Sequence, residues 1–330
     1  MAEDYSAGQV VPCVQCDGYS YVLRLPKGYD SQRDEKWPVL FIMSAGGGKV
    51  ATLDRYIPGA DLCGWILAVS IESKNSNDGR VSHEAITSMV EDVFDRLPVN
   101  EKRCYSSGMS GGGREAFWMA NQFRRNIIGM IPCGAGDCGN NVANDALAYG
   151  LCGANCFNRW DMTITFAERI RTRGVLRFFA GGHTWAQEPL ITEAILWLNG
   201  KYLEDDGSEN EISTFSRVLL EKASSLETNS PEFAYHACCV LSEIKGLPEK
   251  KDVVALQKKL ATDPAVTLML EAREDIAEFA DEHFNTNVAD CYDCRTTESS
   301  EEDSAELRQK YAGTKYEDLM SLLGSPSKEL

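Results

Sequence analysis

Short apolar runs alternate with stretches of helical spacing over roughly the first two hundred residues. Segments 37–43 and 65–71 are almost entirely apolar, as strands buried on both faces of a parallel sheet are. Segment 18–24 instead alternates and is rich in aromatic residues, which is typical of a half-exposed edge strand. Further strands of the buried kind are predicted at 104–108, 127–132, 148–152 and 175–179.

Helices are predicted between these strands. In 83–96 the apolar residues recur three or four positions apart, so one face of the helix is apolar. The other helices of this part are expected at 114–123, 159–173 and 189–198. Strands that alternate with helices indicate an α/β fold, with a mostly parallel sheet covered by helices.

The pattern changes after residue 203. The stretch 204–211 is acidic and polar, and we interpret it as a linker. Beyond it only helical spacing is found, with a polar loop expected at 295–304. Helices are predicted at 212–226, 231–245, 249–261, 265–284 and 305–323. We therefore expect an α/β domain over 1–203 and a small all-helical domain over 204–330.

Charge separates the two parts further. The 330 residues carry a net charge of −17, with 43% hydrophobic and 25% charged residues, as in a globular protein. Residues 1–200 hold 19 basic and 22 acidic side chains, and residues 201–330 hold 14 and 28. This acidity disfavours nucleic acid and anionic membranes as partners. We expect the C-terminal helices to cover the first domain, to bind a protein partner or to hold a substrate polymer.

No targeting or membrane segment is visible. No apolar run approaches the roughly 20 residues that a membrane helix needs, and the first residues have neither a basic flank nor an apolar stretch. The sequence as written predicts a cytoplasmic protein, or a secreted or periplasmic one if a signal peptide was removed.

Twelve cysteines are many for a cytosolic chain. Cys13 and Cys16 have the spacing of half a zinc ribbon, and so have Cys291 and Cys294, but some 275 residues separate the pairs. Local disulfides or buried thiols fit equally well. We expect no metal site and no cofactor.

Ser110 lies in Gly-Met-Ser-Gly-Gly, which matches G-x-S-x-G. That pattern needs a sharp turn between a strand and a helix, where only small neighbours fit and the serine hydroxyl becomes accessible. A predicted strand precedes Ser110 and a predicted helix follows it. Ser110 is therefore the candidate nucleophile, against the alternative of a structural glycine turn.

A second glycine-rich loop, Ser-Ala-Gly-Gly-Gly, follows the strand at 37–43. We expect Gly46 or Gly47 to offer one backbone N–H to an oxyanion, and Gly111 to offer another. An ordinary turn between strand and helix is the alternative. The spacing of a phosphate-binding loop fails, because Lys49 is not followed by Ser or Thr.

His183 is the candidate general base. It follows Phe-Phe-Ala-Gly-Gly, just past the last predicted strand, so it should lie above the carboxyl edge of the sheet. Of the other three histidines, His236 and His283 belong to the helical tail and His83 begins a helix before Ser110.

The order of these motifs resembles the α/β-hydrolase superfamily, most of all its esterase branch with the feruloyl esterases and polyhydroxybutyrate depolymerase-like proteins. Tyr-Val-Leu-Arg-Leu-Pro-Lys-Gly-Tyr-Asp near the start adds to the resemblance, which covers residues 15–200. It implies that Ser110 attacks an ester, that His183 moves the proton, and that Gly111 with Gly46 or Gly47 holds the oxyanion.

The acid of the triad is where the sequence departs from that family. Cys156 takes the place of the expected carboxylate, and a buried thiol resists ionisation. Asp137, after the preceding strand, is our favoured substitute, and Asp161 is a second. A Ser–His dyad or an inactive site are the remaining alternatives. Losing the orienting acid costs about 10⁴-fold in turnover but leaves some catalysis.

These features predict a carboxylic-ester hydrolase that forms an acyl-serine intermediate and acts on a small or polymer-attached ester. Thioesterase activity would use the same chemistry, whereas nothing in the sequence would grip the terminus of a peptide. The rival hypothesis is a non-catalytic binding module that kept the hydrolase fold and binds a partner through its helical domain.

Overall fold

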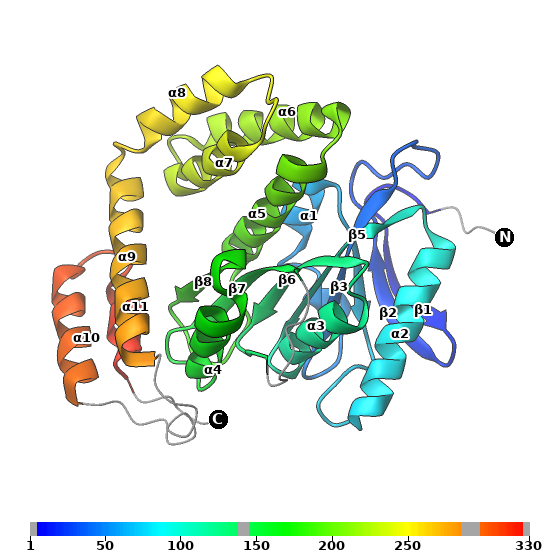
Figure 1. The fold of residues 1–330 in the computed structure, drawn as a ribbon, viewed down its shortest axis with the longest axis horizontal. Helices are drawn as coiled ribbons and strands as arrows, with labels where there is room; N and C mark the ends of the chain where they lie inside the picture. Colours follow the sequence, from blue (N-terminus) through cyan, green and yellow to red (C-terminus); the bar gives the residue numbers. More distant parts are fainter. Residues whose placement is uncertain (1–4, 138–144, 285–297, 326–330) are drawn as a thin grey trace. The chain divides into compact units, whose positions relative to one another are not determined.

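The computed structural model describes residues 5–137, 145–284 and 298–325, and it contains an eight-stranded sheet (Figure 1). The strands lie in the order β1-β2-β4-β3-β5-β6-β7-β8. Those from β3 to β8 run parallel, and β2 runs antiparallel to both of its neighbours. Their bounds are β1 Val10–Cys16, β2 Tyr19–Arg24, β3 Trp37–Ser44, β4 Ile66–Ser70, β5 Val99–Met109, β6 Ile127–Cys133, β7 Leu147–Gly153 and β8 Gly174–Phe179.

The apolar runs of the sequence form strands, as predicted, and most of them are buried. All five residues of β4 and all but the last of β3 are buried. Strand β8 is the exception, because only Phe179 among its six residues is buried. Because β3 and β5 to β8 are parallel, their carboxyl ends lie at the same edge of the sheet, where sites of open α/β sheets are found. The loops that follow β3, β5, β7 and β8 therefore converge, and they carry most of the candidate residues.

Three helices of this unit pack against the strands. Helix α2 (Gly79–Arg96) contacts β1, β2, β4 and β5, whereas α3 (Gly111–Gln122) contacts β3, β5 and β6. Asp78 begins α2, because its carboxylate accepts the backbone N–H of Arg80. Helix α4 (Arg159–Ile164) contacts β7. The other helical segments of this unit are η1 (Val50–Thr52), η2 (Thr165–Ile170), η3 (Arg171–Arg173), α10 (Glu298–Lys310) and α11 (Glu317–Leu323).

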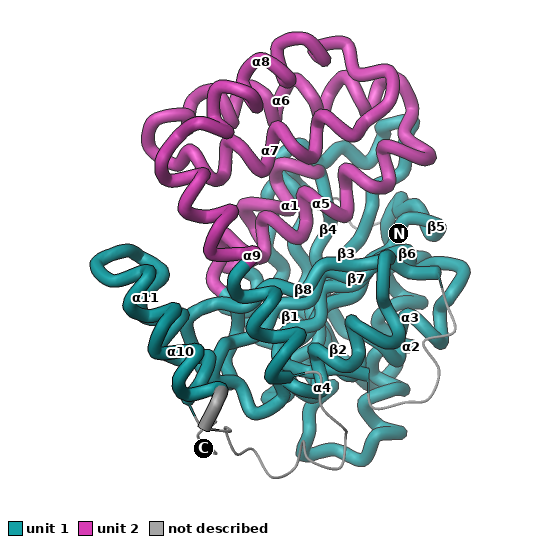
Figure 2. The backbone as a smooth tube through the Cα atoms, turned by 60° about the vertical axis from the view of Figure 1, so that its left-hand side comes forward, with its two compact units in different colours: residues 1–54, 64–186, 275–330 teal, residues 55–63, 187–274 magenta. Residues whose placement is uncertain are grey.

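The chain divides into two compact units (Figure 2). The sheet unit comprises residues 1–54, 64–186 and 275–330, and the helical unit comprises 55–63 and 187–274. The helical unit has its own apolar core, in which Leu219 and Leu241 are fully buried. Its helices are α1 (Ile57–Cys63), α5 (Glu188–Asp206), α6 (Glu209–Leu226), α7 (Pro231–Glu243), α8 (Lys250–Leu260) and the first half of α9 (Pro264–Phe284).

This division differs from the predicted boundary at residue 203. Helix α5 continues into the supposed linker as far as Asp206, and α6 begins at Glu209 behind a capping box of Ser208 and Glu211. The acidic residues stand on helices rather than in a loop. The last two helices, α10 and α11, belong to the sheet unit.

Strand β1 and helix α1 were not predicted, and a loop was predicted where the structure has helix α10. Strand β1 is an edge strand with a proline and a register shift between Val11 and Val14, so its residues do not alternate cleanly. Helix α1 is only seven residues long. Helix α10 occupies much of the expected loop at 295–304. No helix in the described ranges is long and apolar enough to cross a membrane.

Of the two cysteine pairs with zinc-ribbon spacing, only Cys13 and Cys16 lie in the described part of the chain. Both are free thiols, one exposed and one buried. Cys291 and Cys294 lie outside the described residues, as does Cys138.

The turn from β5 into α3 requires backbone segments to pack closely against one another. A Cβ at Gly108 would collide with the carbonyl group of Gly112 and would lie 2.7 Å from the carbonyl oxygen of Met43. Both neighbours are backbone atoms and cannot rotate away. Glycine at this position thus lets the first turn of α3 pack directly on strands β3 and β5.

We predict that Gly108→Ala destabilises the protein by about 1–3 kcal/mol, because the added methyl group overpacks a rigid site. Gly28→Ala is the matched control, since no atom lies within 4 Å of a Cβ at Gly28. Urea unfolding followed by circular dichroism measures both variants. Equal stability of the two would contradict this account of the turn.

Candidate active site

Ser110 stands between the last residue of β5 and the first residue of α3. Its backbone has φ 58° and ψ −121°, a conformation that non-glycine residues seldom adopt. The surroundings hold it there, since its N–H donates to the carbonyl of Cys133 at 2.9 Å and its carbonyl accepts the N–H of Arg114 at 3.1 Å. This turn leaves the side chain partly exposed at the carboxyl edge of the sheet.

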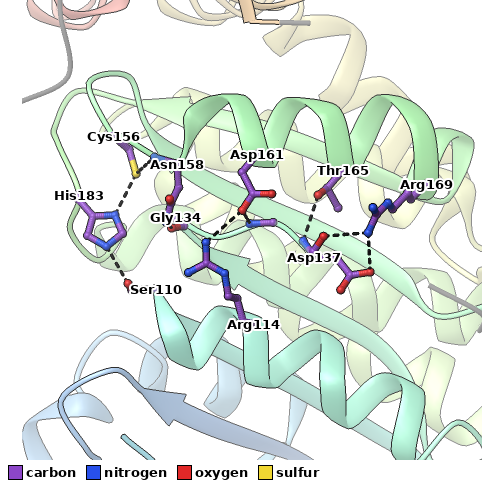
Figure 3. A network of polar contacts seen from close by, with 11 residues as sticks. Ser110, Arg114, Gly134, Asp137, Cys156, Asn158, Asp161, Thr165, Arg169 and His183 are labelled. Carbon is purple, nitrogen blue, oxygen red and sulfur yellow. Dashed lines mark hydrogen bonds and ion pairs between the residues drawn. The ribbon is translucent and has the colours of Figure 1, made fainter. Parts of the chain in front are cut away.

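His183 lies in the loop after β8, as the sequence predicted, and it contacts Ser110 directly. Its Nε2 atom is 2.8 Å from Oγ of Ser110 (Figure 3). The imidazole ring lies against the ring of Phe157, with 3.9 Å between the ring centres. Serine and histidine are thus within hydrogen-bond reach and the ring is held in place.

The other ring nitrogen of His183 faces a sulfur atom. Nδ1 is 3.0 Å from Sγ of Cys156, which is fully buried. The loop that carries Cys156 follows β7 and is bound to the loop after β8 by backbone hydrogen bonds. Ala154 donates to Phe179 and Asn155 donates to Gly181, each at 2.9 Å. Sulfur, imidazole and hydroxyl therefore form a continuous chain of contacts.

The surroundings of Cys156 favour its thiolate form. A hydrogen bond from the Cys152 thiol contributes most to lowering the pKa of Cys156, and His183 and the backbone N–H of Asn158 lower it further. Burial opposes them, yet the pKa falls from 9.0 to about 5. The pKa of Cys152 moves in the other direction, because it is fully buried and lies beside that thiolate. The pKa values of the two neighbouring thiols thus move in opposite directions, and a negative charge is favoured on Cys156 rather than on Cys152.

Neither aspartate considered from the sequence contacts His183. The carboxylate of Asp137 pairs with Arg169 at 3.1 Å, and its backbone N–H donates to Thr165, so it is bound to η2 (Figure 3). Asp161 accepts the N–H of Gly136 at 2.9 Å and lies 3.4 Å from Arg114. Both carboxylates are committed to other partners, and Cys156 occupies the place beside Nδ1.

The two glycines of the loop after β3 differ in their backbone contacts. The N–H of Gly47 donates to Ser44 at 2.9 Å, so it is already used. The N–H of Gly46 makes no backbone hydrogen bond in the described part of the chain. Gly111 begins α3, and N–H groups in the first turn of a helix have no acceptor within it. The N–H groups of Gly46 and Gly111 therefore fit the oxyanion-binding role expected from the sequence better than that of Gly47 does.

Arg159 connects the Cys156 loop to the last helix of the sheet unit. Its guanidinium is fully buried and donates to the carbonyls of Ala154 at 2.6 Å and Ser325 at 3.0 Å. The same group lies 4.4 Å from the centre of the Trp160 ring and 4.6 Å from that of Phe284. The C-terminal helices thereby support the loop that presents Cys156.

Sequence reasoning missed three residues around this chain of contacts. Cys152 hydrogen-bonds to Cys156, Phe157 packs on His183, and Asn158 donates its side-chain N–H to the carbonyl of Gly134 at 2.7 Å. The four-residue spacing of Cys152 and Cys156 was the available signal. It could not show that the chain turns back between them and brings the two sulfurs together.

The strand order, the antiparallel β2 and the strained serine between β5 and α3 together decide the fold. It is an α/β-hydrolase fold. No family model matches the sequence, and no curated protein matches it. Solved structures of low sequence identity are similar to part of this chain.

Three of these structures illustrate the likeness. The fluorophosphonate-binding serine hydrolase F of Staphylococcus aureus is 15% identical with a TM-score of 0.47, over 59% of this chain and 99% of that one. The S-formylglutathione hydrolase of the same organism is 16% identical with a TM-score of 0.48, over 60% and 99%. The feruloyl esterase module from Clostridium thermocellum is 12% identical with a TM-score of 0.45, over 58% and 88%.

One group of side chains in the described ranges has the composition of a metal site, and it lies away from Ser110 in the sequence. Glu282, His283 and Asp303 each offer a ligand atom, and all three atoms lie within 4.8 Å of one another. His283 already pairs with Asp303 at 3.0 Å, which explains the proximity without an ion.

We predict that Cys152→Ala raises the pKa of Cys156, because the variant removes the largest favourable interaction of the thiolate. The folded protein should lose the Cys156 thiolate as the pH falls through about 5, and the variant should lose it at a higher pH. Ultraviolet thiolate absorbance, taken as the difference from Cys156→Ala, measures this titration. Cys238→Ala, which removes a buried cysteine of the helical unit, should leave the titration unchanged.

Proposed function

We propose that this protein is a serine hydrolase of carboxylic esters, with Ser110 as nucleophile, His183 as general base and the Cys156 thiolate as the third member of the triad. The observation that carries the proposal is the chain of contacts Ser110 Oγ, His183 Nε2, His183 Nδ1 and Cys156 Sγ, at 2.8 and 3.0 Å. The turn around Ser110 then acts as a nucleophile elbow.

The first half of the reaction makes an acyl-serine. Ser110 Oγ attacks the ester carbonyl while its proton moves to Nε2 of His183. The backbone N–H groups of Gly46 and Gly111 hold the negative oxygen of the tetrahedral intermediate. The C–O bond to the alcohol then breaks, and the alcohol leaves with the proton from Nε2.

The second half of the reaction hydrolyses the acyl-serine and regenerates the free enzyme. Water gives its proton to Nε2 of His183 and attacks the acyl carbonyl, and the acid leaves as Ser110 recovers its proton. In both halves His183 becomes an imidazolium whose Nδ1–H donates to Cys156. A thiolate there stabilises this cation and fixes the tautomer of the neutral ring, which are the roles of the carboxylate in ordinary triads.

Burial argues against Cys156 as the nucleophile. Its side chain has no exposed surface, whereas Ser110 is partly exposed at the sheet edge. A substrate carbonyl can reach the hydroxyl but not the sulfur. Cys156 therefore acts on the reaction through His183, as a positioning residue.

The charge at position 156 should govern turnover. We predict that Cys156→Ala lowers kcat by about 10³- to 10⁴-fold, as loss of the orienting acid does in related triads. Cys156→Asp should retain most of the activity because it restores a negative charge beside Nδ1, and Cys156→Ser should fall between them because its hydroxyl stays neutral. Hydrolysis of p-nitrophenyl acetate measures all three, with unfolding curves to confirm that each variant is folded.

Covalent labelling separates the enzyme from a binding module that kept the fold. We expect a fluorophosphonate probe to label the native protein on Ser110 and to leave Ser110→Ala unlabelled, because only an activated serine attacks the phosphorus. Folded native protein that neither reacts with the probe nor hydrolyses the ester would overturn the proposal. The non-catalytic alternative would then hold.

A further inference from the structure

A polar cavity of about 240 Å³ lies beside the first turn of α3. Gly111, Gly112 and Ser44 form the wall nearest to Ser110, and the loop between β4 and α2 forms the opposite wall. No apolar side chain lines it. The full lining is Ser44, Ser73, Lys74, Asn75, Asn77, Gly79, Ser82, Gly111, Gly112, Arg114 and Glu115. The lining thus offers charged and hydrogen-bonding groups to a substrate, beside exposed carbon atoms.

The loop that carries Lys74 is fixed against the glycine-rich loop after β3. The N–H of Asn75 donates to the carbonyl of Ala45 at 2.9 Å, and Lys74 forms an isolated β-bridge with Gly46. The side-chain amide of Asn75 lies against Gly111, in the space that a Cβ atom of that residue would occupy. Lys74 is thus held beside both proposed oxyanion donors by backbone contacts rather than by its own side chain.

The ammonium group of Lys74 has no ion pair in the described part of the chain. Its methylene groups lie along the glycine loop, with Cδ 3.7 Å from the position of a Gly47 Cβ. The acids around it are engaged elsewhere: Asp78 caps α2, Glu72 accepts from Ser20 at 2.8 Å, and Glu115 lies 3.1 Å from His83. Arg114, the other cation of the cavity, faces Asp161 at 3.4 Å.

The charges that line the cavity favour an anion. The chain carries a net charge of −17, but residues 1–200, which include the whole lining, hold 19 basic and 22 acidic side chains. Within this nearly neutral part of the chain the cavity holds two cationic side chains and one carboxyl. Burial raises the pKa of Glu115 to about 7, so its negative charge is only partial at neutral pH. The Lys74 side chain is exposed at this cavity, so its ammonium group is accessible to an anion that binds there.

We propose that this cavity binds a carboxylate carried by the substrate, with Lys74 as its main ligand, so that the preferred substrates are anionic carboxylic esters. This inference rests on the proposed hydrolase function and narrows it to a substrate class. The carboxylate can be attached to the acyl part or to the alcohol part of the ester, and suitable probe esters distinguish these two positions.

The experiment compares kcat/KM for charged and neutral esters on the full chain. Mono-p-nitrophenyl succinate is compared with p-nitrophenyl butyrate for the acyl side, and para-acetoxybenzoate with its methyl ester for the alcohol side. The native enzyme should prefer the charged member of one pair. Lys74→Met, which keeps most of the side-chain methylene groups, should lower that preference by about twofold to fivefold, the range expected for one exposed ion pair.

Three further variants sharpen the comparison. Lys74→Glu should reverse the preference because it places a negative charge in the cavity, and Lys74→Arg should restore most of it. Lys102→Met makes the same change in net charge as Lys74→Met, at an exposed position roughly 25 Å along β5 from Ser110. It should leave the preference as it is. Added salt should weaken the native preference, since it screens the pair.

Binding gives a readout that does not need turnover. Monomethyl succinate is titrated into Ser110→Ala protein by calorimetry, with and without Lys74→Met. Ester hydrolysis with equal rates for charged and neutral esters would overturn the cavity assignment and leave the proposed function standing. Binding that depends on Lys74 without any hydrolysis would support the cavity and overturn the function. Neither binding nor hydrolysis would overturn both.

Discussion

One contact between a ring nitrogen and a sulfur atom determines what the site can do. Nδ1 of His183 faces Cys156 at 3.0 Å, and the opposite nitrogen faces Ser110. If the sulfur were a neutral thiol, it could not balance the charge that a histidine gains as a base. The neighbouring Cys152 thiol and the Asn158 N–H make the anion favourable despite burial. In the proposed mechanism, this pair of cysteines supplies the charge that a single carboxylate supplies in a Ser-His-Asp triad.

Backbone hydrogen bonds, more than side chains, bring the site together. The loops after β7 and β8 are joined at Ala154 and Asn155. The loop after β4 is joined to the glycine loop at Asn75, and the serine turn is fixed by the contact of its N–H with Cys133. The backbone positions of these loops therefore do not depend on the side chain that faces Nδ1 of His183, which here is the thiol of Cys156.

The sequence predicted what depends on local pattern and missed what depends on contact. Buried strands, the serine turn and the histidine after the last strand each have a local signature, and the structure contains all three. Asp137 was favoured as the acid because parallel strand ends are neighbours, but Arg169 and Thr165 bind it on η2. The lowered pKa of Cys156 depends on Cys152 and His183, which only folding brings near. The edge strand β1 and the short helix α1 have no clear hydrophobic periodicity in the sequence, and they were not predicted either.

The buried guanidinium of Arg159 joins two distant parts of the chain. Its partners are the Ala154 carbonyl beside the Cys156 loop and the Ser325 carbonyl after α11, more than 160 residues later. The Phe284 ring lies 4.6 Å from the same group. A change that displaces α11 would therefore remove one acceptor of this cation, at a cost in free energy, and would weaken the support of the loop that carries Cys156.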